Sequence, residues 1–160
     1  MGDQRGAPVR PGRRPLPARA LSLKRFAEAQ AGVHERALAE LRAGRKTSHW
    51  MWFVFPQIAG LGHSAMAVRY ALSGLDEARA YLADPVLGAR LRECAAALLA
   101  LPEDATAEAV LGGIDALKLR SSMTLFARAS GDPLFSAVLE RYYDGVEDPA
   151  TLAQLSDRGQ

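Results

Sequence analysis

One segment in the first half of the chain gathers ring-bearing and polar side chains around glycines. Both tryptophans and two of the five phenylalanines fall within residues 50–55, directly after His49. Indole and imidazole rings combine an apolar body with a polar edge, a glutamine amide can donate and accept, and glycines let a backbone approach a ligand closely. The segment therefore favours a pocket that stacks a planar ring and fixes its edges. With His49 as a candidate catalytic group, the candidate binding residues are Trp50, Trp52, Gln57, Gly60, Gly62 and Ser64.

A second cluster lies within residues 114–130. Asp115, Lys118 and Ser122 follow one another at intervals of three and four residues, so in a helix they share one face. A carboxylate beside an ammonium group and hydroxyls can bind a sugar, a phosphate or a water nucleophile. Asp115 would then be the catalytic carboxylate that stabilises an oxocarbenium-like centre or orients water. Lys118, Ser121 and Ser122 would hold ribose or phosphate.

Both clusters also have a purely structural interpretation. A helix-packing core with a glycine turn explains the first, and an N-cap at Asp115 with an exposed ion pair explains the second. The three histidines lack the spacing of a helical zinc pair, and Cys94 falls on the apolar face of its helix. No glycine-rich phosphate-binding motif is present. We therefore expect no bound metal and no other cofactor.

Composition narrows the class of protein. The 160 residues are 49% hydrophobic and 24% charged, which is typical of one globular domain. No run of about 18 apolar residues exists and no apolar secretory stretch opens the chain, so we expect a cytoplasmic protein without a membrane span. Five arginines and one acid give residues 1–20 a charge of +4, so the rest of the chain is at −2 and a nucleic-acid partner is not expected.

Apolar residues recur at helical spacing after residue 20, which predicts an all-α fold of six or seven helices. We expect residues 21–157 to form a single domain that starts near Ser22, with residues 45–64 as an aromatic-rich insertion. Residues 1–20, rich in arginine and proline, are expected to be a disordered tail. The predicted helical segments are 22–43, 64–70, 74–82, 85–101, 106–111, 114–130 and 133–143, and residues 148–156 are predicted as a last turn or short helix.

Several motifs together resemble one bacterial family over about residues 22–156. They include Arg25-Phe26-x-x-Ala29-Gln30, His49-Trp50-Met51-Trp52-Phe53, Gly60-Leu61-Gly62-x-Ser64 and Ser121-Ser122-Met123-Thr124-Leu125-Phe126. On these motifs the chain is identified as a member of the family named domain of unknown function 1810, sometimes mislabelled calpastatin. The resemblance implies a small, mostly helical protein and brings no established activity. Calpastatins are long and disordered, unlike this chain.

A fold-level resemblance extends to the NADAR family of small helical N-glycosidases, which act on ribosyl-linked substrates including ADP-ribose adducts. The matching positions are Ala29-Gln30 and Asp115 with Met123, whereas the glutamate that NADAR proteins carry before Ala-Gln has no counterpart here. The resemblance implies an N-glycoside hydrolase. Two alternatives stay open: a non-catalytic module for a nucleotide-like small molecule or a protein partner, and an interaction protein without a ligand. The sequence leaves the oligomeric state open.

Overall fold

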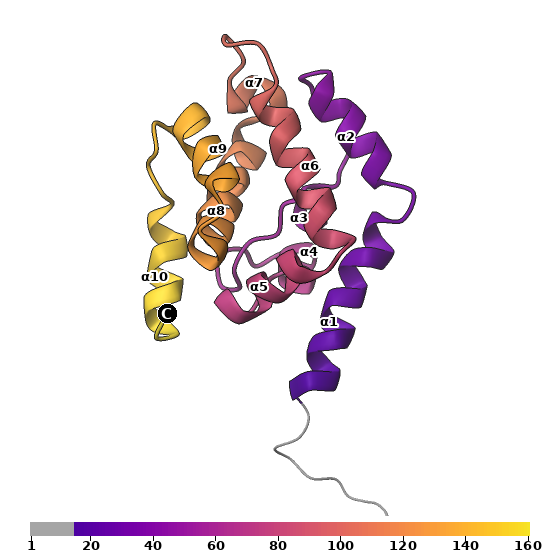
Figure 1. Ribbon diagram of the computed structural model, residues 1–160, viewed down its shortest axis with the longest axis vertical. Helices are drawn as coiled ribbons and strands as arrows, with labels where there is room; N and C mark the ends of the chain where they lie inside the picture. Colours follow the sequence, from indigo (N-terminus) through magenta and orange to yellow (C-terminus); the bar gives the residue numbers. More distant parts are fainter. Residues whose placement is uncertain (1–14) are drawn as a thin grey trace, which may run out of the picture.

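Helices form almost all the regular structure between residues 15 and 160 (Figure 1). This computed structural model describes the backbone of residues 15–160 and the side chains of residues 23–160. Within that part the predicted all-α class is confirmed. The helices are α1 (Pro15–Gln30), α2 (His34–Arg42), α3 (Met51–Val54), α4 (Ala65–Arg69), α5 (Leu75–Ala83), α6 (Leu87–Leu99), α7 (Ala107–Leu111), α8 (Gly113–Ser130), α9 (Pro133–Tyr143) and α10 (Pro149–Asp157).

The described part has ten helices instead of the predicted six or seven. The expected first helix over 22–43 is divided into α1 and α2, because Gly32 has a positive φ of 74° that ends the first helix. A further short helix, α3, forms inside the predicted aromatic insertion. The predicted start at Ser22 lies within α1, and residues 1–14 of the predicted tail lie outside the described residues. No helix among residues 15–160 has the length and apolar character needed to cross a membrane.

Helix α8 is the centre of the packing and contacts α5, α7, α9 and α10. Six consecutive residues of α8, 121–126, are buried, so neighbours surround this helix on every side. Its first turns differ, because the side chains of Ile114 and Leu117 are 74% and 65% exposed. The start of α8 therefore faces solvent while its second half forms the core.

A buried glutamine joins the N-terminal helices to this core. The side chain of Gln30 is 2% exposed. Its Nε2 donates to the carbonyl oxygen of Phe53 at 2.7 Å and lies 2.9 Å from the hydroxyl of Tyr81. These hydrogen bonds connect α1, α3 and α5, so Gln30 has a clear structural role.

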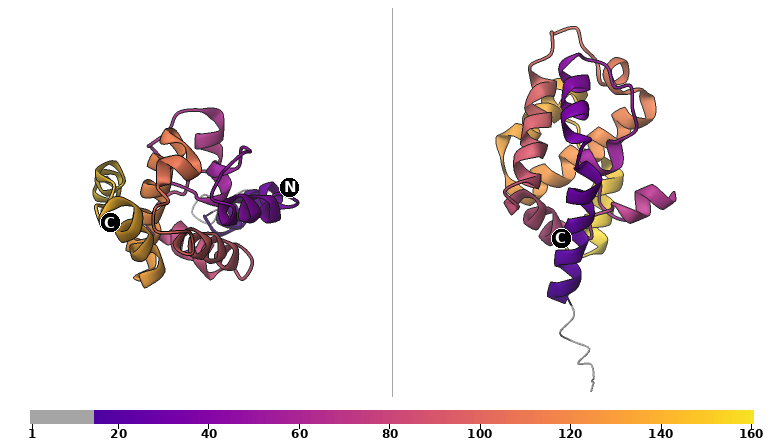
Figure 2. Two further views of the ribbon diagram at one scale, coloured as in Figure 1. Left: turned by 90° about the horizontal axis from the view of Figure 1, so that it is seen from above. Right: turned by 90° about the vertical axis from the view of Figure 1, so that its right-hand side faces the viewer.

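Residues 60–68, including most of α4, form a lobe that projects from the helical body (Figure 2, right). No residue of α4 is buried. The two ends of this 60–68 lobe are held together by a single parallel bridge between Ile58 and Leu72. Arg25 fixes one end further, since its Nη2 donates to the carbonyl oxygen of Ala71 at 2.6 Å. The base of the lobe is thus held by hydrogen bonds, whereas α4 near its tip contributes no buried residue.

Candidate functional site

Two neighbouring pockets lie where residues 46–64 face the start of α8. The first, which we call the Trp52 pocket, has a volume of about 450 Å³ and is lined by Lys46, His49, Met51, Trp52, Leu111, Gly112, Gly113, Ile114, Asp115 and Lys118. The second, the Ser121 pocket, has a volume of about 390 Å³ and is lined by Gln57, Leu61, Gly62, His63, Ser64, Ala67, Ile114, Leu117, Lys118, Ser121, Asp148 and Ala150. Both pockets share Ile114 and Lys118, so they adjoin.

Charge in the Trp52 pocket is concentrated around one carboxylate. Lys46 Nζ lies 2.9 Å from Asp115 Oδ2, and Lys118 Nζ lies 3.7 Å from Asp115 Oδ1. Lys118 Nζ also lies 4.8 Å from the centre of the Trp52 ring, within the range of a cation–π contact. Two ammonium groups and one carboxylate leave this cluster with a formal charge of +1, beside an indole ring.

The loop that carries Lys46 and His49 is held by Glu40, a residue of α2 that the sequence analysis missed. One oxygen of the Glu40 carboxylate accepts from the backbone amides of Thr47 and Ser48 at 2.8 and 3.1 Å and from the Trp50 indole at 2.9 Å. The other accepts from the Ser48 hydroxyl at 2.6 Å. Burial raises the pKa of Glu40, but these hydrogen bonds outweigh it and lower the pKa to about 2.

Three predicted binding residues do not line either pocket. Trp50 is fully buried and its indole N–H is satisfied by Glu40, so its ring cannot stack a ligand. Ser122 is also fully buried, on a different side of α8 from Ser121. Gly60 has a φ of 99°, a conformation that favours glycine, and the end of the Gln154 side chain lies where a Cβ would stand, so this glycine has a structural role. The prediction that Trp50, Ser122 and Gly60 line the binding site is therefore wrong.

The remaining predicted residues are brought together. The Trp52 pocket contains His49, Trp52, Asp115 and Lys118, and the Ser121 pocket contains Gln57, Gly62, Ser64, Lys118 and Ser121. Two of their hydroxyls already have local partners. Ser64 caps α4 by accepting from the Ala67 amide at 3.1 Å, and Ser121 Oγ donates to Asp148 Oδ2 at 2.8 Å.

The backbone at the start of α8 forms one wall of the Trp52 pocket. Gly112 and Gly113 line it, and a Cβ added to either would meet nothing within 4 Å. Neither glycine is therefore required by neighbouring side chains. The sequence did not indicate these glycines, Lys46 or Asp148 as site residues, because their place in a pocket depends on which distant segments meet at α8.

The positions matched through the NADAR resemblance do not share a pocket. Asp115 lines the Trp52 pocket, whereas Gln30 is buried under Phe53 and Tyr81 and lines neither of the two pockets. A glutamine that bonds a core carbonyl cannot contact a ligand held beside Asp115.

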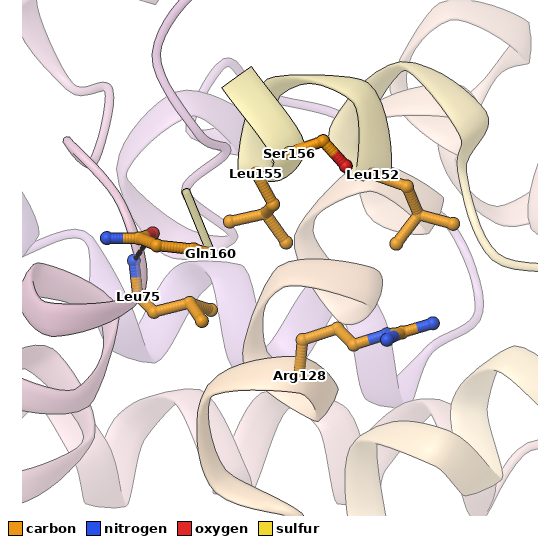
Figure 3. Close-up of a pocket in the computed structure, with 6 residues that line it drawn as sticks. All are labelled: Leu75, Arg128, Leu152, Leu155, Ser156 and Gln160. Carbon is orange, nitrogen blue, oxygen red and sulfur yellow. Dashed lines mark hydrogen bonds between the residues drawn. The ribbon is translucent and has the colours of Figure 1, made fainter. Parts of the chain in front are cut away.

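A third pocket, of about 390 Å³, lies between α5, α8 and α10 (Figure 3). The guanidinium of Arg128 is engaged there by both oxygens of Glu147 at 2.7 Å. The amide oxygen of Gln160 accepts from the backbone N–H of Leu75 at 2.8 Å and so caps α5. None of the predicted site residues lines this pocket, and these polar groups already serve the fold.

A larger hollow of about 600 Å³ runs along α2 beside α6, where His34 Nε2 lies 3.0 Å from Glu93 Oε1. Throughout residues with described side chains, no three His, Cys, Asp or Glu residues are grouped so that they could hold a metal ion. Cys94 is buried, and burial raises the pKa of its thiol to about 12. This thiol is therefore protonated and inert at neutral pH.

Comparisons with known proteins agree with the fold and name no activity. The sequence model of a family described as Protein of unknown function (DUF1810) matches residues 20–155. The conserved hypothetical protein Rv1873 from Mycobacterium tuberculosis, whose crystal structure is solved, is 52% identical, with a TM-score of 0.82. The match covers 84% of this chain and 96% of that one. No curated protein matches the sequence.

Proposed function

This chain belongs to the family described as Protein of unknown function (DUF1810), and we propose that it binds a small, anionic, nucleotide-like molecule in the Trp52 pocket. The observation that carries this proposal is the position of Lys118. Its ammonium group lies over the Trp52 ring and beside Asp115, at the point where the two predicted clusters meet. A ring and a cation side by side are suited to a ligand that combines a planar group with a negative charge.

The lysine content of the chain strengthens this argument. The sequence contains 17 arginines and only three lysines, and two of the three, Lys46 and Lys118, converge on Asp115. A lysine ammonium is a compact point charge that binds phosphate oxygens from several directions. The pocket volume of about 450 Å³ also falls in the range of small-molecule sites, about 300–1,000 Å³.

Hydrolysis of an N-glycosidic bond is the second candidate, because Asp115 and His49 line the same pocket. Such cleavage needs a carboxylate free to approach the anomeric carbon or to orient water. The oxygens of Asp115 lie 2.9 and 3.7 Å from two ammonium groups, and these two positive charges make the carboxylate a weaker base and nucleophile. Binding without cleavage does not depend on this basicity and is the function that we favour.

Titration with AMP tests the proposal. We expect AMP to change the indole emission of the wild type with saturation and to leave the emission of Trp52→Phe unchanged, since only the buried Trp50 remains there. Lys118→Ala should weaken AMP binding about tenfold in calorimetry, the loss of one charge-assisted contact of about 1.4 kcal/mol. Lys24→Ala, which changes an exposed lysine on α1, is the matched control and should bind AMP like the wild type.

The same samples separate binding from hydrolysis. Release of adenine from AMP, followed by chromatography, would favour the N-glycosidase, provided that Asp115→Asn abolishes it. Stable AMP in the presence of saturable binding favours the binding module. Absence of saturable binding in the wild type, or equal affinities of wild type and Lys118→Ala, would refute the proposed site.

A further inference from the structure

The two pockets lie side by side along one helix and share Lys118. Resting on the function proposed above, we infer that the ligand is bipartite: an internal phosphodiester or pyrophosphate at Lys118 joins two ring- or sugar-bearing groups, one in the Trp52 pocket and one in the Ser121 pocket. The inference concerns the class of ligand and extends the proposed site from one pocket to two.

Spacing along α8 supports an internal charge. Gly113 lines the first pocket and Ser121 the second, and eight residues of helix span about 12 Å at 1.5 Å per residue. Lys118 lies between them, about 7.5 Å from Gly113 and about 4.5 Å from Ser121 along the axis. An anionic group at Lys118 therefore has space for further ligand atoms on both sides. The phosphate of a mononucleotide stands at one end of the molecule, so a mononucleotide would leave one pocket unfilled.

The two ends of the site offer different chemistry. The Trp52 pocket presents an indole ring and open backbone, which suit a planar base. The Ser121 pocket presents the Gln57 amide and the Asp148 carboxylate. Asp148 Oδ2 accepts hydrogen bonds from Ser121 and from Thr151, whereas among the described residues none is donated to Oδ1. That oxygen is an acceptor for a ligand hydroxyl or amine.

Exposed apolar side chains separate the pockets. Ile114 lines both and is 74% exposed, and Leu117 lines the Ser121 pocket and is 65% exposed. They are two of the five large hydrophobic side chains that stand exposed in the described part of the chain. A ligand that crosses from one pocket to the other covers Ile114, and removing this apolar surface from water favours binding.

The test compares diadenosine pyrophosphate with AMP by calorimetry. Gly113→Leu adds a side chain at a lining position of the Trp52 pocket that has open space and no positive φ. Ala150→Leu enlarges an exposed side chain that lines the Ser121 pocket. Ala89→Leu, at an exposed position of α6 outside both pockets, is the control for a larger apolar side chain. Thermal unfolding shows whether each variant is folded; if one is not, Gly113→Ala or Ala150→Val replaces it.

We expect diadenosine pyrophosphate to bind the wild type at least tenfold more tightly than AMP. Each pocket variant should weaken that complex at least tenfold. Gly113→Leu should weaken AMP to the same extent, whereas Ala150→Leu should leave the affinity for AMP unchanged, and Ala89→Leu should bind both nucleotides as the wild type does. Equal affinities for the two nucleotides would overturn the bipartite ligand and leave the proposed function intact. So would an unchanged affinity of Ala150→Leu for diadenosine pyrophosphate. Failure of both nucleotides to bind would overturn the inference and the proposed function together.

Discussion

Glu40→Gln removes the charge that organises the loop carrying Lys46 and His49. The carboxylate accepts four hydrogen bonds from residues 47–50, and these lower its pKa from the ordinary 4.5 to about 2 against the opposing effect of burial. A pKa difference of one unit corresponds to about 1.4 kcal/mol, so the contribution of the Glu40 charge to the unfolding free energy is at most about 3 kcal/mol. Since Glu40 is only half-buried, solvent screening reduces the expected loss of unfolding free energy to about 2 kcal/mol.

Thermal unfolding at pH 7 should show this loss as a decrease in Tm of about 6 °C for a domain of this size. The pH dependence gives a second measurement. Because the pKa of Glu40 is lower in the folded state, its contribution is present above pH 4.5 and is lost as the pH falls toward 2. The Tm difference between wild type and Glu40→Gln should therefore narrow over that interval.

The control is Glu28→Gln on α1, an exposed carboxylate that pairs with Lys24 at 3.8 Å and should lower the Tm by at most about 2 °C. A Glu40→Gln variant as stable as the wild type at pH 7 would show that solvent replaces the four hydrogen bonds. A Tm difference that stays constant from pH 7 to pH 3 would show that the effect does not arise from the charge. Either result would refute the role assigned to Glu40.

Three further predictions concern the buried polar groups. Ser122 Oγ is buried with no hydrogen-bond partner among the described residues, so Ser122→Ala should leave the unfolding free energy in urea unchanged or raise it by up to about 1 kcal/mol. Ser121→Ala removes a hydrogen bond to a carboxylate and should lower the unfolding free energy by about 1.5 kcal/mol. A Ser122→Ala variant less stable than Ser121→Ala would contradict both assignments. Gln30→Leu should lower the unfolding free energy by about 2 kcal/mol, because the Phe53 carbonyl loses its 2.7 Å donor and keeps only the Tyr81 hydroxyl at 3.5 Å. A neutral result would mean that water reaches this site. Since burial raises the pKa of Cys94 to about 12, its thiol should react with a disulfide reagent at pH 8 only after unfolding; fast reaction of the folded protein would argue against its burial.

Local signals in the sequence predicted the second half of the fold closely. Asp132 and Asp148 each precede a proline, and each caps its helix by accepting from a backbone amide, at Leu134 and Thr151 respectively. The predicted 133–143 and 148–156 became α9 and α10 with ends shifted by at most one residue. Capping and proline chemistry act within a few residues, so they can be recognised without knowledge of the tertiary structure.

Tertiary contacts decided what the sequence could not. Trp50 and Trp52 stand two positions apart and have the same chemistry, yet one is buried against Glu40 and the other lines a pocket. Likewise Ser121 faces a pocket while Ser122, about 100° further around α8, points into the core. The sequence identified the segments that meet at the site, but which side chain of each reaches it depends on helices packed from elsewhere.

The base of the 60–68 lobe has a consequence for how this protein can be changed. The ends of the lobe meet at the bridge between Ile58 and Leu72, while its tip buries no residue of α4. Residues inserted at the tip therefore lower the stability of the fold mainly through loop-closure entropy, by about 0.6 kcal/mol for each doubling of the loop length. Leu61, Gly62 and Ser64 supply one wall of the Ser121 pocket, but Leu61 packs against the core and a Cβ at Gly62 would lie 2.7 Å from Ala67 Cβ. The wall can therefore be lengthened by insertion next to Ser64, whereas Leu61 and Gly62 are best left unchanged. On the function that we propose, changes in this wall would alter the choice of ligand, whereas the stability of the fold depends on the helices around α8.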